Sequence, residues 1–153
     1  MIISANKFKC YQGGVVMSQI MTLSASMQDY LEAILELEEE EKTVRITDIA
    51  NKLKIAKASV NQTINKFKDM GLVRHQVYGP VELTEAGREL ADKIIQRHRK
   101  LRQFLIEVLG VDTSIAEKDA CLMEHAVSPQ TMEQLTDFLC RNGYIVENSN
   151  VNK

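Results

Sequence analysis

One stretch of the chain combines helical and strand patterns in an order that few folds allow. Apolar residues recur at helical spacing over 46–53 and again over 57–70, and only three residues separate the two segments. Gly71 ends the second segment, and two runs with strand-like composition follow at 72–77 and 81–83. The sequence therefore predicts two helices joined by a tight turn, followed by a small hairpin.

This layout is typical of a winged helix-turn-helix, whose second helix enters the major groove of DNA. The predicted outward-facing residues of that helix are Lys57, Ser59, Asn61, Gln62 and Lys66. Gln pairs bidentately with adenine, Ser and Asn reach base edges or phosphates, and Lys neutralises the backbone. The alternative is a helix pair with a solvated polar face that touches no DNA.

The distribution of charge favours the DNA-binding alternative. The chain of 153 residues has a net charge of −2, but residues 42–102 carry fourteen Lys or Arg against six acids. The flanking segments 22–41 and 103–153 are acidic. A basic segment of this kind is the electrostatic footprint of a nucleic-acid partner.

Composition narrows the class of protein further. Three cysteines form no Cys-x-x-Cys pair and leave an odd count, which favours a reducing cytoplasm over a disulfide scaffold. No segment is long and apolar enough to span a membrane. Residues 1–21 are expected to be a disordered extension, and 147–153 a polar tail.

Further helices are expected around the helix-turn-helix. A first helix over 27–40 would be opened by a capping box of Ser26 and Asp29. A long helix over 84–110 would link the two halves of the chain, and Ser128-Pro129 would open a final helix.

A cluster of possible metal ligands lies near the end of the chain. Cys121, Glu124 and His125 are spaced i, i+3 and i+4 on a helix that Ser114 and Glu117 would open with a capping box. Thiol, carboxylate and imidazole are three types of transition-metal ligand. An ordinary amphipathic helix rarely needs all three so close together.

Three more candidate ligands lie elsewhere, each with a simpler explanation. Asp29 can be only the acid of a capping box, and Glu32 only part of a solvated face. His98 borders the apolar stripe of the long helix, where a partly buried histidine is more usual than a ligand. Cys121 alone is most often a small core residue.

The chain resembles the diphtheria toxin repressor and manganese transport regulator family of bacterial metal-dependent repressors from about Thr22 to Gly143. The resemblance rests on six motifs in family order, at 26–32, 45–50, 58–64, 83–87, 97–101 and 120–125. It implies that Ala58 joins the DNA-contacting positions. It also implies one metal held by Asp29, Cys121, Glu124 and His125. Glu32 and His98 would hold a second metal that shares ligands from the Cys121 helix.

The candidate site is a hybrid of two branches of that family. Cys121 resembles the iron-responsive branch, whereas Asp29 and Glu32 resemble the manganese-responsive branch. Arg102 and Glu117 replace ligands of the iron branch's second site, and no SH3-like third domain of that branch is expected from this sequence. The shorter, manganese-type layout is therefore expected, with Mn²⁺ or Fe²⁺ bound, one or two per chain.

The expected fold is mainly α, with a winged helix-turn-helix at 22–91 joined by a long helix to a helical metal-binding and dimerisation domain at 92–146. The expected function is a transcriptional repressor in which Fe²⁺ or Mn²⁺ orders a homodimer on a palindromic operator of metal-homeostasis genes. One alternative is a winged-helix regulator that senses an organic ligand or no effector. Another is a two-metal hydrolytic enzyme, but no spare base or nucleophile stands out, so no enzymatic activity is expected.

Overall fold

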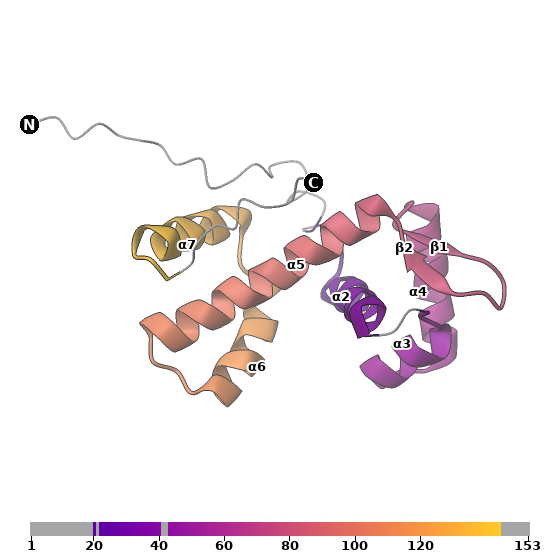
Figure 1. Ribbon diagram of the computed structural model, residues 1–153, viewed down its shortest axis with the longest axis horizontal. Helices are drawn as coiled ribbons and strands as arrows, with labels where there is room; N and C mark the ends of the chain where they lie inside the picture. Colours follow the sequence, from indigo (N-terminus) through magenta and orange to yellow (C-terminus); the bar gives the residue numbers. More distant parts are fainter. Residues whose placement is uncertain (1–19, 21, 41–42, 145–153) are drawn as a thin grey trace, which may run out of the picture.

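The computed structural model describes residues 20, 22–40 and 43–144, arranged around one long helix, α5 (Glu85–Gln103). Figure 1 shows helices α2, α3 and α4 and a two-stranded hairpin at one end of α5, with α6 and α7 on either side of its other end. Most of the expected extension and the whole expected tail lie outside the described residues. Ile20 is described and is fully buried in the core.

Helix α2 (Ala25–Glu40) packs between α5 and α3 and supplies much of the core. It begins earlier than expected, because the hydroxyl of Ser24 accepts a hydrogen bond from the backbone N–H of Met27. The predicted capping box of Ser26 and Asp29 is therefore wrong, and Asp29 is left available for other contacts.

The helix-turn-helix forms as predicted. Helix α3 (Ile46–Leu53) and helix α4 (Lys57–Asp69) are joined by a turn in which Lys54 adopts the left-handed conformation, with φ of 56°. The inward face of α4 consists of Val60, Ile64 and Phe67, all fully buried. Gly71, with φ of 72°, follows the end of α4, where a residue with a Cβ is disfavoured.

The hairpin pairs β1 (Val73–His75) with β2 (Val81–Leu83) in antiparallel register, with Val73 opposite Leu83. Strand β1 is shorter than the predicted 72–77, because the backbone turns at Gln76, whose carbonyl oxygen accepts from Gly79 N–H. The exposed tip includes Tyr78, with a φ of 64°.

Helix α5 begins at the predicted start of the long helix, where the hydroxyl of Thr84 caps it by accepting a hydrogen bond from Gly87 N–H. A Cβ at position 87 would collide with the carbonyl oxygen of Leu72, so the absent side chain lets the helix lie directly on the end of α4 and β1. Glu38 of α2 adds a second link, accepting from Leu83 N–H at 2.8 Å and pairing with Arg88.

The long helix does not continue as an α-helix to its end. After Gln103 it widens into a π-helix, η1 (Phe104–Val108), in which Leu109 N–H donates to Phe104 O. Gly110, with φ of 68°, lets Val111 N–H donate back to Leu105 O, which closes the helix.

Two shorter helices complete the chain. Helix α6 (Thr113–Glu124) is capped by Asp112, which accepts from Ser114 N–H, so the predicted capping box of Ser114 and Glu117 is wrong. Helix α7 (Pro129–Arg141) is opened by Ser128, as predicted. Within the described part of the chain, no helix is both long and apolar enough to cross a membrane.

Candidate metal centre and nucleic-acid interface

The carboxylate of Glu124 lies at the centre of the candidate metal site. Its side chain is 1% exposed, and Oε2 accepts a hydrogen bond from Nδ1 of His98 at 2.9 Å. The other oxygen, Oε1, lies 3.5 Å from Nε2 of His125 and has no hydrogen-bond donor among the described residues. A buried carboxylate oxygen without a donor is costly, unless a cation occupies the position it faces.

His125 joins the end of α6 to α2. Its Nδ1 lies 3.0 Å from Oε1 of Gln28, and its Nε2 lies 3.0 Å from Oδ1 of Asp29. The amide nitrogen of Gln28 donates to the carbonyl oxygens of Ile20 and Leu23, so the Gln28 oxygen must be the atom that faces His125. Nδ1 of His125 therefore carries a proton, and Nε2 is the nitrogen directed towards the carboxylates.

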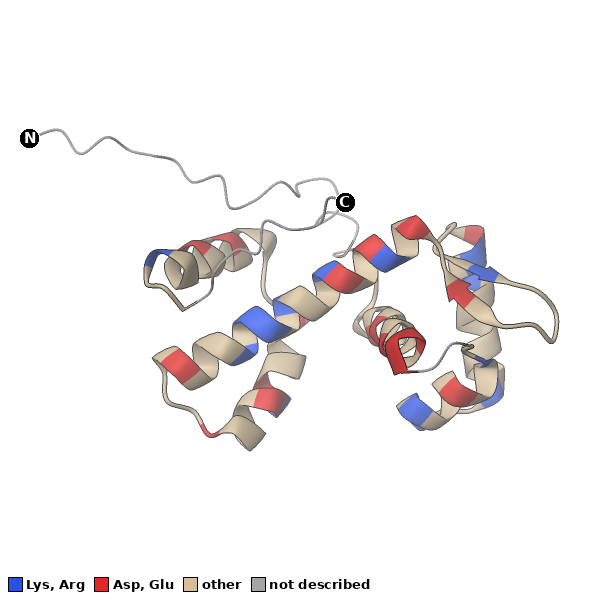
Figure 2. Ribbon diagram, viewed as in Figure 1, with Lys and Arg blue, Asp and Glu red and all other residues tan. Residues whose placement is uncertain are grey.

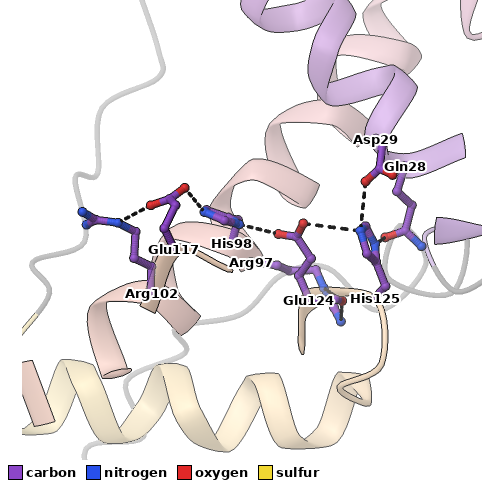
Figure 3. A network of polar contacts seen from close by, with 8 residues as sticks. All are labelled: Gln28, Asp29, Arg97, His98, Arg102, Glu117, Glu124 and His125. Atoms are coloured by element: carbon purple, nitrogen blue, oxygen red, sulfur yellow. Dashed lines mark hydrogen bonds and ion pairs between the residues drawn. The ribbon is translucent and has the colours of Figure 1, made fainter. Parts of the chain in front are cut away.

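His98 is held from two sides, as Figure 3 shows. Nδ1 contacts Glu124, while Nε2 lies 2.9 Å from Oε1 of Glu117, whose other oxygen accepts from Arg102 at 2.6 Å. Both partners of the imidazole are acceptors, so both of its nitrogens carry protons in this arrangement. Arg102 and Glu117 thus form an ion pair beside His98.

The structure brings all six predicted ligands together. One ligand atom each from Cys121, Glu124 and His125 lie within 4.8 Å of one another. The same separation holds for Asp29, Glu32 and Glu124. Glu124 belongs to both groups, and His98 is hydrogen-bonded to it. Residues far apart in sequence thus meet because α2 and α6 both pack against α5.

Negative charge is crowded in this cluster. Burial, followed by the nearby Glu124 carboxylate, raises the pKa of Glu32 from 4.5 to about 8. The hydrogen bond to Glu124 raises the pKa of His98 from 6.5 to about 9, against the opposing effect of burial. Burial and Glu124 also raise the pKa of the Cys121 thiol. In the metal-free protein, protons therefore provide the neutralisation that a divalent cation would supply.

The ligand set fits a divalent transition metal. Carboxylates, imidazoles and one thiol suit first-row ions, and the unpartnered Oε1 of Glu124 lies among them. Gln28 contacts one ring nitrogen of His125, and Glu117 contacts one ring nitrogen of His98. Metal-binding histidines commonly have such a hydrogen-bond partner on the nitrogen that does not bind the metal. Cys121 is exposed as a residue although its thiol is partly desolvated, so it is not the small core residue considered above.

Several polar residues of the site are not among the predicted ones. Buried Arg97 donates to the carbonyl oxygens of Glu124 and Val127, which holds the end of α6 against α5. Gln28 is 3% exposed and orients His125. Both lie inside family-like motifs, and the only signal in the sequence is a polar residue at a helix position that the apolar pattern assigns to the core.

The predicted DNA-binding residues form a separate surface on α4. All six are exposed: Lys57, Ala58, Ser59, Asn61, Gln62 and Lys66. Figure 2 shows basic residues on α3, α4 and β1, whereas the visible end of α2 is acidic. This arrangement leaves the outward side of α4 open to an anionic partner.

Comparison with known proteins identifies the family of the chain. Residues 22–81 match the family described as the N-terminal DNA-binding domain of iron-dependent repressors, and residues 84–142 match the metal-binding and dimerisation domain of the same repressors. An uncharacterised helix-turn-helix regulator of Methanocaldococcus jannaschii is 36% identical over 118 residues, which cover 76% of this chain and 94% of the relative. The chain belongs to the iron-dependent repressor family.

Other members of the iron-dependent repressor family agree with this placement. The regulator MntR of Shouchella clausii is 31% identical over 114 residues, covering 74% of this chain and 79% of the relative. The structure of a manganese-dependent transcriptional repressor complexed with manganese superposes with a TM-score of 0.68 at 32% identity. That match covers 74% of this chain but 52% of the other, so this chain spans about half the length of that repressor.

A protein of Sulfolobus solfataricus has a similar size. Its structure has a TM-score of 0.63 at 25% identity, and the match covers 78% of this chain and 91% of that one.

As an iron-dependent repressor family member, the chain is a metal-responsive, DNA-binding transcriptional regulator and not an enzyme. The resemblance stated from the six motifs is confirmed, as is the mainly helical fold.

Proposed function

We propose that Asp29, Cys121, Glu124 and His125 hold one divalent ion, and that Glu32 and His98 extend the site to a second. Mn²⁺ and Fe²⁺ are the proposed ions, with one or two bound per chain. The single observation that carries the proposal is the buried Oε1 of Glu124, which has no hydrogen-bond donor among the described residues and belongs to a carboxylate grouped with ligand atoms of α2 and of its own helix.

The ligands connect the two proposed halves of the chain. Asp29 and Glu32 belong to α2, which packs against the helix-turn-helix, whereas Glu124 and His125 lie at the end of α6. Sharing an ion would hold α2 and α6 at one separation. The proposed DNA-reading half spans 22–91 and the proposed metal-binding half spans 92–146. In this proposal the two halves lie at opposite ends of α5.

The proposed assembly is a homodimer formed by the C-terminal helices. Large apolar side chains are exposed there, with Leu122 at 74%, Leu109 at 57% and Ile115 at 52%. A symmetric dimer presents two copies of α4 and fits a palindromic operator whose half-sites lie about 34 Å, or a multiple of that distance, apart. In this proposal the ion sets the separation of the two α4 helices, and the apo protein samples unsuitable separations.

The proposed role of α4 is to read the operator, with Ser59, Asn61 and Gln62 at base edges and Lys57 and Lys66 at phosphates. Ala58 is exposed on the same helix, and its small side chain would let the wall of the major groove approach closely. The regulated genes would be those of metal homeostasis, and the protein would act in the cytoplasm.

The decisive experiment measures DNA binding with and without the ion. A pool of random duplexes is selected with protein and Mn²⁺, and the enriched duplex is then titrated in chelator and in Mn²⁺, Fe²⁺, Co²⁺ and Zn²⁺ without oxygen. We expect enrichment of an inverted repeat and tight binding only with metal. Equal affinity in chelator would defeat the proposal.

Matched variants separate the metal site from general acidity. Glu124→Gln keeps the shape of the side chain but removes the charge at the centre of the site, so it should lose the response to metal while remaining folded. Glu133→Gln removes an exposed charge from α7 and should respond like the original protein. Unfolding of Glu124→Gln even in the absence of metal would favour a purely structural role.

A further inference from the structure

The ring of His98 has a carboxylate on each side, and the two carboxylates differ in burial. Nδ1 lies 2.9 Å from Oε2 of Glu124, whose side chain is 1% exposed. Nε2 lies 2.9 Å from Oε1 of Glu117, whose side chain is 56% exposed, and Figure 3 shows the imidazole between the two. An imidazole binds an ion through one nitrogen and carries a proton on the other. An ion on one side of the ring therefore requires a hydrogen-bond acceptor on the other.

The candidate ligands are gathered on the Nδ1 side of the ring. Glu124 belongs to both groups of possible metal ligands that the described residues form, and its Oε1 has no hydrogen-bond donor among those residues. Glu117 belongs to neither group. Both of its oxygens already accept hydrogen bonds, one from His98 and one from Arg102. An ion is therefore expected at Nδ1, with Glu117 as the acceptor on the opposite side.

Arg102 holds Glu117 from one turn farther along α5. His98 and Arg102 are spaced i and i+4, so both face the same side of α5, where they meet Glu117 of α6. Nε of Arg102 donates to Oε2 of Glu117 at 2.6 Å. The guanidinium is a permanent positive charge, and it disfavours a second cation beside the same carboxylate. The pair thus holds Glu117 as a hydrogen-bond acceptor and not as a metal ligand.

We propose that Glu117 is a positioning residue of the metal site: held by Arg102, it accepts a hydrogen bond from Nε2 of His98 and directs Nδ1 of His98 at the ion beside Glu124. It supplies no ligand atom itself. Ligation by His98 therefore depends on two residues outside the six proposed ligands. This inference rests on the proposed metal site and adds the residues that determine how one of its ligands is presented.

A double-mutant cycle tests whether Glu117 acts through the imidazole. Calorimetric titration with Mn²⁺ compares the original protein, Glu117→Ala, His98→Ala and the double variant, at the binding step that His98→Ala weakens. We expect Glu117→Ala to weaken this step by about 10- to 100-fold, the usual effect of removing the partner of a metal-binding histidine. The double variant should bind no more weakly than His98→Ala alone, because a residue that acts through the ring has no effect once the ring is removed.

Two further variants separate the hydrogen bond from the charge of Glu117. Combining Glu117→Gln with Arg102→Leu keeps the net charge of the chain and leaves an amide oxygen for Nε2 of His98, with no guanidinium competing for it. This paired variant should retain most of the original affinity. Asp119→Asn removes a carboxylate from an exposed position of the same helix and should bind Mn²⁺ like the original protein. Melting temperatures in chelator check that every variant is folded.

Nitrogen-15 NMR identifies the coordinating nitrogen directly. The chain has three histidines, so protein labelled at histidine and loaded with diamagnetic Zn²⁺ gives few signals. His98→Gln marks the signals that belong to that ring. We expect zinc on Nδ1 of His98 and a proton on Nε2.

Four results would overturn the inference. Mn²⁺ binding that is unchanged in His98→Ala or in Glu117→Ala rejects it, as does zinc on Nε2 of His98. Equal losses from Glu117→Ala with and without His98 would assign Glu117 a purely structural role. A paired variant as weak as Glu117→Ala would assign the effect to the charge of the carboxylate. The proposed metal site is rejected separately, if the folded original protein binds neither Mn²⁺ nor Fe²⁺.

Discussion

The amide oxygen of Gln28 lies 3.0 Å from Nδ1 of His125, across 97 residues of sequence. Two backbone carbonyls fix the orientation of the amide, and the amide in turn fixes which nitrogen of His125 carries the proton. The nitrogen opposite is thereby directed at Asp29. Metal-binding histidines commonly depend on a partner of this kind.

Gln28→Leu is therefore expected to lower the affinity for Mn²⁺ by about 10- to 100-fold. Leucine has a similar size but no amide oxygen, so the ring of His125 loses its hydrogen-bond partner and can turn. Calorimetric titration with Mn²⁺ measures the change, and Gln96→Leu on an exposed position of α5 is the control. Unchanged affinity in Gln28→Leu would show that His125 does not need this partner.

The metal-free protein is expected to lose stability as pH rises. The folded-state pKa is raised from 4.5 to about 8 for Glu32 and from 6.5 to about 9 for His98. Both groups bind protons more tightly when folded, so their stabilising contributions are complete below pH 4.5 and 6.5 and are lost as pH passes about 8 and 9. Melting temperatures in chelator should fall through this window.

Two comparisons make that pH dependence specific. His98→Gln should flatten the part of the decline that lies between pH 6.5 and about 9. Added Mn²⁺ should raise the melting temperature most at the alkaline end, because the ion then competes with fewer protons. A melting temperature that rises with pH in chelator would contradict the assignment.

Cys121 should influence which ion is preferred. Its thiol pKa is raised by burial and by Glu124, so the metal-free protein carries a neutral thiol that must lose a proton to coordinate an ion. Cys121→Ser is expected to weaken Co²⁺ and Zn²⁺ binding more than Mn²⁺ binding, because thiolate favours the softer ions. Cobalt titration followed by its sulfur charge-transfer absorption measures this, with Cys140→Ser as control.

Gly87→Ala should destabilise the fold by roughly 1–3 kcal/mol, because the new Cβ meets the carbonyl oxygen of Leu72 and the helix must move. Denaturant unfolding in chelator measures the loss. Gly79→Ala is the comparison, since its Cβ would approach neighbouring atoms to 3.3 Å only and should cost less. Equal losses at the two positions would mean that α5 adjusts freely.

Local signals in the sequence predict much of the fold. Helix α3 has the predicted bounds, and Ser128 caps α7, because both depend on residues within one turn. The predicted caps of α2 and α6 are wrong for a local reason. Ser24 and Asp112 are equally good caps, and each lies two residues before the predicted one. Spacing alone does not decide between them.

The candidate site depends on packing that no local pattern contains. Sequence spacing relates Glu124 to His125 and Asp29 to Glu32, but their meeting requires α2 and α6 to pack on the same part of α5. The ion pair of Arg102 and Glu117 beside His98 is likewise a contact between helices. The resemblance to the family motifs predicts that these residues come together, whereas helical periodicity does not.

Gly87 and His98 occupy one uninterrupted α-helix, about 16 Å apart along its axis. At the first position the helix rests on the backbone of Leu72, and at the second it meets the carboxylates of α6. The α-helix is unbroken between these two residues, so a tilt of α5 at His98 moves the hairpin with it as one rigid body.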